Sequence, residues 1–210
     1  EKQLAIQAAE QRVKDQIARD LHDDVAASMS GIRILSQVAY GQLKGKASGT
    51  ASLMEQINQN AQATLDSISD LIWAVKPHPD YMNDMADRMR DYAGKVLDAK
   101  DIDYLMDIPR NLPVRNLDIE TRRNVYLIFK EAVNNAMKYS NCSRMEVSLH
   151  VQQDKLVLRV ADDGAGFENG KTQKGNGLRN MEKRAGDINA DFRIDTAPGK
   201  GTEVMVVVPL

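Results

Sequence analysis

The sequence contains a single cysteine, Cys142, in 210 residues, and it has no long apolar run. One thiol cannot form a disulfide framework within a chain, which favours a reducing compartment. No apolar segment approaches the ~18 residues that a membrane-spanning helix needs, and no signal peptide is visible. The formal net charge is −2, so electrostatics give no reason to expect binding to nucleic acid or to an acidic membrane surface.

The first part of the chain, residues 1–78, has the pattern of a helical hairpin. Apolar residues recur at steps of three and four from Val13 to Ala39 and again from Leu53 to Val75. Glycines in residues 41–49 predict a turn, and Pro77 ends the second helix. Two helices with one apolar stripe each bury little surface alone, so we expect a four-helix bundle in a homodimer. Packing of the hairpin on the rest of its own chain is the alternative.

The second part, residues 79–210, mixes helical and strand patterns. Its strands are expected to pair mainly through hairpins, which predicts an α/β sandwich with a mixed or largely antiparallel sheet rather than a doubly wound parallel sheet. Helices are expected at residues 84–99, 119–139 and 178–185, and strands at residues 102–108, 145–151, 155–161, 192–196 and 202–208.

Residues 162–166, Asp-Asp-Gly-Ala-Gly, follow a predicted strand and precede a second glycine pair, Gly175 and Gly177. A carboxylate at a strand end can accept a hydrogen bond from one specific donor. Glycines beside it let the backbone approach a ligand closely or adopt positive φ. The combination indicates a purine nucleotide, whereas Asp-Gly pairs alone also form ordinary turns.

Glu131, Asn135 and Lys138 share one face of the long predicted helix because they are spaced by four and three residues. Asn135 offers a neutral oxygen suited to Mg²⁺, Glu131 could orient a water on that ion, and Lys138 could reach a phosphate. A solvated helix face would look similar. The adjacent pair Asn134-Asn135 favours the functional interpretation, since asparagine is a poor helix former.

Two familiar phosphate-binding motifs are excluded by the glycines themselves. Gly175-Asn176-Gly177 lacks the third glycine of a dinucleotide fingerprint, and the Gly-Lys-Gly-Thr run of residues 199–202 interposes a glycine before the threonine of a P-loop. The default interpretation of residues 199–202 is a hairpin turn.

Taken together, four motifs resemble the Bergerat ATPase fold of histidine kinases, Hsp90, gyrase B and MutL. They are Glu131-Asn135-Lys138-Tyr139, Asp162-x-Gly164-x-Gly166, Gly175-x-Gly177-Leu178 and Gly201-Thr202. The resemblance implies that the chain binds ATP and Mg²⁺, with Asn135 holding the metal ion and Asp162 reading the adenine amino group. It further implies that Thr202 supports the adenine through a water, that Lys138 contacts phosphates, and that Tyr139 stacks on the base. Residues 167–175 would be a short ATP lid.

A candidate phosphoryl acceptor, His22, lies on the first predicted helix within Arg-Asp-Leu-His-Asp-Asp, residues 19–24. With an ordinary pKa of ~6.5, its imidazole is mostly neutral at pH 7 and has a lone pair for attack. A hydrogen bond from Nδ1–H to Asp23 would fix the tautomer and leave Nε2 bare. Taken alone, this histidine is more simply explained as structural, and the ATP site downstream reverses that judgement.

This acceptor segment, followed by a hairpin and an ATPase domain, resembles the NarL/DesK-like histidine kinases over nearly the whole chain. The resemblance implies a dimerisation and phosphotransfer domain at residues 1–78 and a catalytic domain at residues 79–210. His22 would take the γ-phosphoryl group, Asp23 would act as its general base, and an aspartate of a response regulator would receive the phosphoryl group. The chain would then be the cytoplasmic portion of a membrane-bound sensor, with any membrane segment upstream.

One position departs from the family. Many members carry glutamine or histidine four residues after the acid, where it is associated with dephosphorylation of the partner, and this chain has Ala27. Two alternatives remain open at this stage. One is an anti-sigma-type serine kinase with a similar ATP domain, and the other is a dimeric nucleotide-binding scaffold without kinase activity.

Overall fold

The computed structural model divides into two compact units, Glu1–Lys76 and Pro77–Leu210. It describes residues 80–113, 117–168 and 176–210, together with residues 31, 32, 34, 35, 38, 56, 57, 60, 61, 63, 64, 66, 67, 69, 70 and 73. His22, Asp23, Ala27 and Gly175 lie outside the described residues, as does most of the segment predicted to be the lid.

In the first unit, every described residue is helical. A Cβ placed on Gly31 would lie 3.8 Å from Nδ2 of Asn60, so the two helical segments approach each other at this level. Ile34 and Val38, one turn apart, are 56 % and 42 % exposed. Both expected helices are therefore represented among the described residues, and one of them presents aliphatic side chains on its surface.

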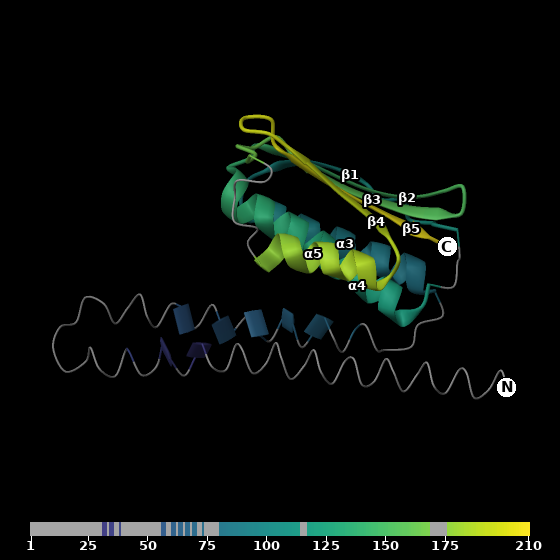
Figure 1. Ribbon diagram of the computed structural model, residues 1–210, viewed down its shortest axis with the longest axis horizontal. Helices are drawn as coiled ribbons and strands as arrows, with labels where there is room; N and C mark the ends of the chain where they lie inside the picture. Colours follow the sequence, from purple (N-terminus) through teal and green to yellow (C-terminus); the bar gives the residue numbers. More distant parts are fainter. Residues whose placement is uncertain are drawn as a thin grey trace. The chain divides into compact units, whose positions relative to one another are not determined.

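The second unit is a two-layer α/β sandwich. In Figure 1, the helices α3, α4 and α5 cover one face of a five-stranded sheet with the order β1-β2-β3-β5-β4. Only the β1–β2 pair is parallel, which confirms the expected mixed, largely antiparallel sheet. The elements are α3 (Tyr81–Asp98), β1 (Asp103–Asp107), α4 (Ile119–Asn135), the π-helical turn η1 (Ala136–Ser140), β2 (Arg144–Gln152), β3 (Lys155–Asp162), α5 (Asn176–Asp187), β4 (Asp191–Thr196) and β5 (Thr202–Pro209).

Aspartate caps determine where α3 and α4 begin. The Asp80 carboxylate accepts from the Asn83 N–H at 3.1 Å, so α3 starts three residues earlier than its apolar pattern suggested. The Asp118 carboxylate accepts from the Thr121 N–H at 2.8 Å and from the Thr121 hydroxyl at 2.6 Å. Each cap satisfies donors that a helix N-terminus leaves unpaired, typically stabilising the helix by about 1 kcal/mol.

The core lies between the helices and the sheet because strand residues alternate between its two faces. Met145, Val147 and Leu149 of β2 are at most 1 % exposed and point toward the helices. The opposite face carries charge. There Arg159 bonds Glu203 at 2.7 Å and Glu146 at 3.1 Å, linking three neighbouring strands.

The long helix expected at residues 119–139 consists of an α-helix followed by a π-helical turn. Regular α-helix ends at Asn135, and residues 136–140 form the π-helical turn η1. The Ser140 hydroxyl donates to the Ala136 carbonyl at 2.8 Å, and Asn141 closes the helix with φ 50°. A serine that bonds the carbonyl four residues back competes with the backbone ladder, which is a physical reason for the wider turn here.

Candidate nucleotide-binding site

Asp162, the residue expected to read adenine, ends β3. In the sheet it lies directly opposite Thr202, the first residue of β5. Its Oδ1 accepts from the Gly164 N–H at 2.9 Å, which orients the carboxylate at the strand end. Burial raises the pKa of Asp162 and the charge of Asp163 adds to this rise, whereas hydrogen bonds from Gly164, Ser140 and Thr202 oppose it. The structure thus brings together two residues that are predicted to contact adenine and that are 40 positions apart in the sequence.

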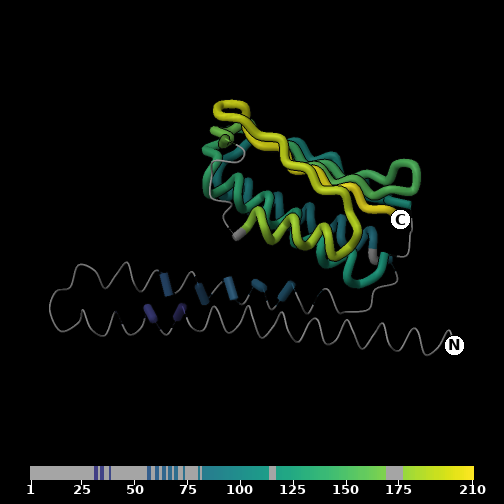
Figure 2. The backbone as a smooth tube through the Cα atoms, viewed as in Figure 1, coloured from purple at the N-terminus to yellow at the C-terminus, as the bar shows by residue number. Residues whose placement is uncertain are grey.

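The loop after β3 closes against the turn between β4 and β5. The Gly201 N–H donates to the Gly164 carbonyl at 2.9 Å, and the Gly199 N–H donates to the Ala165 carbonyl at 2.6 Å. Figure 2 shows the two loops together at one end of the sheet, beside the C-terminal end of the helix formed by α4 and η1. Gly166 has φ 56° and Gly201 has φ 72°, and a Cβ on either would collide with backbone. Glycine is required at both positions.

The third contact of this loop is with η1. The Ala165 N–H donates to the Ser140 carbonyl at 2.7 Å. A Cβ on Gly164 would lie 2.7 Å from the Ser140 carbonyl carbon, so this glycine is also needed for close approach. The loop that follows Asp162, residues 163–166 (the Asp162 loop), and the helix that carries Asn135 are therefore in direct contact.

Glu131 and Asn135 converge beside the first turn of α5. A Cβ added to Gly177 would collide with Oε1 of Glu131 and would lie 3.3 Å from Nδ2 of Asn135. Mg²⁺ takes few protein ligands, all of them oxygens, and keeps waters and phosphate oxygens. Glu131 offers a carboxylate here, and Asn135 would bind through Oδ1 after rotation of the amide whose Nδ2 faces Gly177. Among the residues that the structure describes, no group of three or more His, Cys, Asp or Glu side chains could hold a metal ion alone. Leu178, the next residue of α5, is half-buried.

The two neighbouring asparagines of α4 have different surroundings. Asn134 Oδ1 accepts from the Tyr92 hydroxyl of α3 at 2.7 Å. Asn135 faces Gly177 of α5 instead. Of the pair that drew attention in the sequence, one therefore ties α4 to α3 and the other lies at the candidate site.

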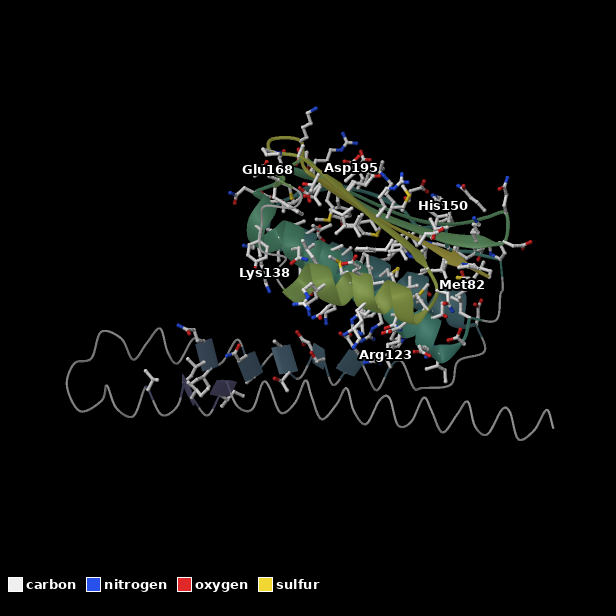
Figure 3. The ribbon with its side chains drawn as sticks, viewed as in Figure 1. Met82, Arg123, Lys138, His150, Glu168 and Asp195 are labelled. Carbon is white, nitrogen blue, oxygen red and sulfur yellow. The ribbon has the colours of Figure 1, made fainter. Side chains whose placement is uncertain are left out.

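Lys138 and Tyr139 lie on η1 and are exposed, with Tyr139 74 % exposed. Figure 3 shows Lys138 at the same end of the unit as Glu168, the last described residue before α5. His150 and Met82 lie toward the other end. Both η1 side chains are accessible to a ligand, and their predicted contacts with phosphate and base stay predictions.

Thr196 is a residue of this region that the motifs did not reveal. It pairs with Thr202 across the hairpin, with 3.1 Å between the two hydroxyl oxygens. Its Oγ1 also accepts from the Phe167 N–H at 3.1 Å and donates to the Gly201 carbonyl at 2.9 Å. The signal was present in the sequence, because a short hairpin turn fixes which residues face each other across it.

Asp163, the second residue of the Asp-Asp pair, is a structural residue. Its Oδ1 accepts from the backbone N–H groups of Ser143 and Arg144, both at 2.8 Å, and its Oδ2 accepts from the Ser143 hydroxyl at 2.7 Å. The Ser143 hydroxyl and the Arg144 N–H lower the pKa of Asp163. This carboxylate joins the end of β3 to the start of β2, next to Asp162.

Comparison with known families assigns both parts of the chain. Residues 120–210 match the family described as histidine kinase-, DNA gyrase B- and HSP90-like ATPase. Residues 14–80 match the family described as histidine kinase. The two matches together span most of the chain, and the chain belongs to the histidine kinases. The ATPase match spans every described residue of the candidate site and confirms the family that the motifs indicated.

Curated relatives of this histidine kinase chain include two sensor proteins of staphylococci. It is 27 % identical to the sensor protein VraS of Staphylococcus epidermidis over 203 residues, which cover 94 % of this chain and 55 % of the relative. It is 27 % identical to the oxygen sensor histidine kinase NreB of Staphylococcus carnosus, covering 97 % of this chain and 58 % of the relative. The chain thus spans little more than half the length of these relatives.

Solved histidine kinase structures share the fold. The histidine kinase domain of the Erythrobacter litoralis EL346 blue-light activated histidine kinase superposes with a TM-score of 0.54 at 17 % identity, covering 88 % of this chain and 94 % of that one. The Acinetobacter baumannii histidine kinase AdeS superposes with a TM-score of 0.59 at 15 % identity, covering 86 % of this chain and 95 % of that one. No helix among the described residues combines the length and the apolar character that a membrane crossing requires.

Proposed function

We propose that the chain is the catalytic portion of an ATP-dependent histidine autokinase in a two-component system. The observation that carries the proposal is the register of the sheet, which places Asp162 directly opposite Thr202. The loop that follows Asp162 contacts Ser140. Ser140 lies five residues beyond Asn135, on the helix whose side chains would contact the phosphates and the metal ion. The carboxylate that would read adenine and the amide that would bind the metal ion therefore belong to one scaffold.

In the proposed reaction, Nε2 of His22 attacks the γ-phosphorus of ATP. A nitrogen–phosphorus bond forms, the bond to the β,γ-bridging oxygen breaks, and ADP leaves. Asp23 takes the proton from Nδ1 as the imidazole becomes positively charged. Positioning and charge neutralisation supply most of the catalysis in phosphoryl transfer, which agrees with a site built from hydrogen bonds and few charged side chains.

On the phosphate side, Asn135 and Glu131 would hold Mg²⁺, either directly or through a water that Glu131 orients. When bound, the ion would neutralise charge on the phosphate oxygens. Lys138 would contact a phosphate, and Tyr139 would stack on the base. Gly177 and Leu178 open α5, and the two glycines of the Asp162 loop keep backbone close to the nucleotide.

Residues 1–78 would form a dimerising hairpin that carries His22, and residues 79–210 would form the catalytic domain. The exposure of Ile34 and Val38 one turn apart supports a homodimer, because a second hairpin would cover them. A response regulator would accept the phosphoryl group on an aspartate. The family's usual dephosphorylation route is not expected with Ala27, since alanine cannot orient a water. The chain would act in the cytoplasm as part of a membrane-bound sensor.

The test is incubation with γ-labelled ATP and Mg²⁺, followed by acid treatment. We expect an acid-labile label on the wild-type chain and none on His22→Ala. His150→Gln is the matched control, because His150 is on β2 and bonds Asp107 rather than the site, so its label should persist. A label that survives in His22→Ala refutes the acceptor assignment. Acid-stable phosphoserine on a partner would favour the serine kinase, and ATP binding without transfer would favour the scaffold.

A further inference from the structure

Ser140 is a buried polar residue, 7 % exposed, to which the motifs assign no role. Its hydroxyl donates to the Ala136 carbonyl at 2.8 Å and accepts from the Cys142 N–H at 3.1 Å. The same side chain therefore joins the π-helical turn, which carries Lys138 and Tyr139, to the segment that enters β2.

The backbone of Ser140 makes a second junction. Its carbonyl accepts from the Ala165 N–H at 2.7 Å, and Gly164 packs so closely against it that no Cβ fits between them. Gly164 and Ala165 belong to the loop that follows Asp162, the last residue of β3. Phosphate-side and adenine-side elements thus meet at one residue.

We propose that Ser140 is a positioning residue that fixes the Asp162 carboxylate relative to the helix carrying Asn135, and so contributes to the choice of adenine. The proposal rests on the proposed ATP site and adds a residue that touches neither base nor phosphate. If the Ser140 hydroxyl is removed, the residue loses its bonds to Ala136 and Cys142. The Ser140 carbonyl that holds the Ala165 N–H can then shift, and with it the Asp162 carboxylate that would meet the amino group of adenine.

The environment of Asp162 supports this role. The Ser140 side chain lies among the groups that oppose the rise in the pKa of Asp162 that burial causes. Asp163 and Cys142 also interact electrostatically with Asp162. The Gly164 N–H already donates to Asp162, so the hydroxyl acts mainly on position, through the Ser140 backbone whose carbonyl holds the Ala165 N–H.

A purely structural role for Ser140 makes a different prediction. A helix-end hydroxyl that only stabilises η1 would lower the melting temperature when it is removed, and binding measured well below that temperature would keep its preference among bases. A positioning role changes the ratio of ATP to GTP affinity, because guanine has a carbonyl where adenine has the amino group that Asp162 would read.

The experiment compares Ser140→Ala with two matched variants in a His22→Ala background, which leaves the nucleotide intact. Ser140→Thr keeps the hydroxyl. Ser143→Ala removes a neighbouring hydroxyl that bonds Asp163 and not Asp162. Dissociation constants for ATP and GTP with Mg²⁺ are measured by calorimetry. We expect Ser140→Ala to reduce the ATP-over-GTP preference roughly three- to tenfold, the effect of one lost hydrogen bond, while the two other variants keep it.

An unchanged preference in Ser140→Ala overturns the proposal, and so does a loss of equal size in Ser143→Ala. If Ser140→Ala does not fold, Ser140→Cys replaces it, since a thiol is a weaker donor and should give a smaller loss in the same direction. Asp162→Asn tests the proposed adenine site separately from the role of Ser140. If Asp162→Asn binds ATP and GTP as the wild-type chain does, the adenine site itself is wrong, whatever Ser140 does.

Discussion

Replacement of Gly177 by alanine should separate stability from activity. The added Cβ would collide with Oε1 of Glu131 and would lie 3.2 Å from its Cδ and 3.3 Å from Nδ2 of Asn135. The obstructing atom is the far end of a flexible side chain, so the collision is relieved by rotation of the carboxylate without backbone movement. To regain ordinary contact, the carboxylate must retreat by on the order of 1 Å.

We expect the substitution to preserve or raise the stability of the chain and to lower its autophosphorylation rate. Glycine is about 1 kcal/mol less favourable than alanine in a helix interior. Gly177 lies in the first turn of α5, so Gly177→Ala should leave the free energy of unfolding unchanged or raise it by less than that amount. A displacement of about 1 Å at a reacting centre can reduce a rate roughly 100-fold. We therefore expect autophosphorylation to fall by about 10- to 100-fold in a protein that is at least as stable as the wild type.

Gly186→Ala is the matched control, because Gly186 lies in the same helix and a Cβ there would have nothing within 4 Å. Thermal unfolding gives the stability of each variant, and label incorporation at several Mg²⁺ concentrations gives the activity. Gly186→Ala should gain stability and keep its rate. If Gly177→Ala also keeps its rate at every Mg²⁺ concentration, the position of the Glu131 carboxylate has no part in phosphoryl transfer.

Three further outcomes are expected from other contacts. The pKa of Asp163 is lowered in the folded chain. Its carboxylate therefore stabilises the fold at pH values above the ordinary aspartate pKa of ~3.9, and this stabilisation is lost as the pH falls through the lowered pKa of the folded chain. Denaturant unfolding should accordingly show Asp163→Asn to be destabilised at pH 7 and the difference to shrink in acid; a constant difference would contradict this. Thr196→Val removes the acceptor of the Phe167 N–H, which should cost about 1–3 kcal/mol of unfolding free energy, and denaturant titration checks the value. Tyr92→Phe removes the hydrogen bond to Asn134 and should cost about 1 kcal/mol by the same method while leaving the dissociation constant for ATP unchanged, which calorimetry checks.

Much of the second unit could be predicted from local patterns. Alternation fixed the strands to within one or two residues, and hairpin turns fixed their antiparallel neighbours. The pairing of β3 with β5 is different, because α5, β4 and the segment predicted to be the lid separate the two strands in the sequence. Nothing local sets that register. The proximity of Asp162 and Thr202 followed from resemblance to a known fold, and the structure supplies the physical reason.

The end of α4 could not be predicted by counting residues. On an ideal helix each residue advances by about 100°, which places Lys138 on the face of Asn135. The π-helical turn begins directly after Asn135, so that count no longer applies to Lys138 or Tyr139. The Ser140 hydroxyl bonds the Ala136 carbonyl, which offers a physical reason for the wider turn. Serine near a helix end usually indicates a cap or a turn, and only the three-dimensional contacts show that it also widens the last turn.

The asparagine pair of α4 shows why position on a helix decides function more than residue type does. α4 packs against both α3 and α5, so adjacent side chains about 100° apart face different neighbours. Asn134 is satisfied by the Tyr92 hydroxyl of α3, and Asn135 faces the first turn of α5. If the nucleotide binds as proposed, between α4 and the loop after Asp162, we expect it to contact the Asn135 amide and not the Asn134 amide. We therefore expect Asn135→Ala to lose ATP affinity and Asn134→Ala to keep it. The reverse result would mean that the nucleotide binds on the α3 side of α4, which contradicts the proposed site.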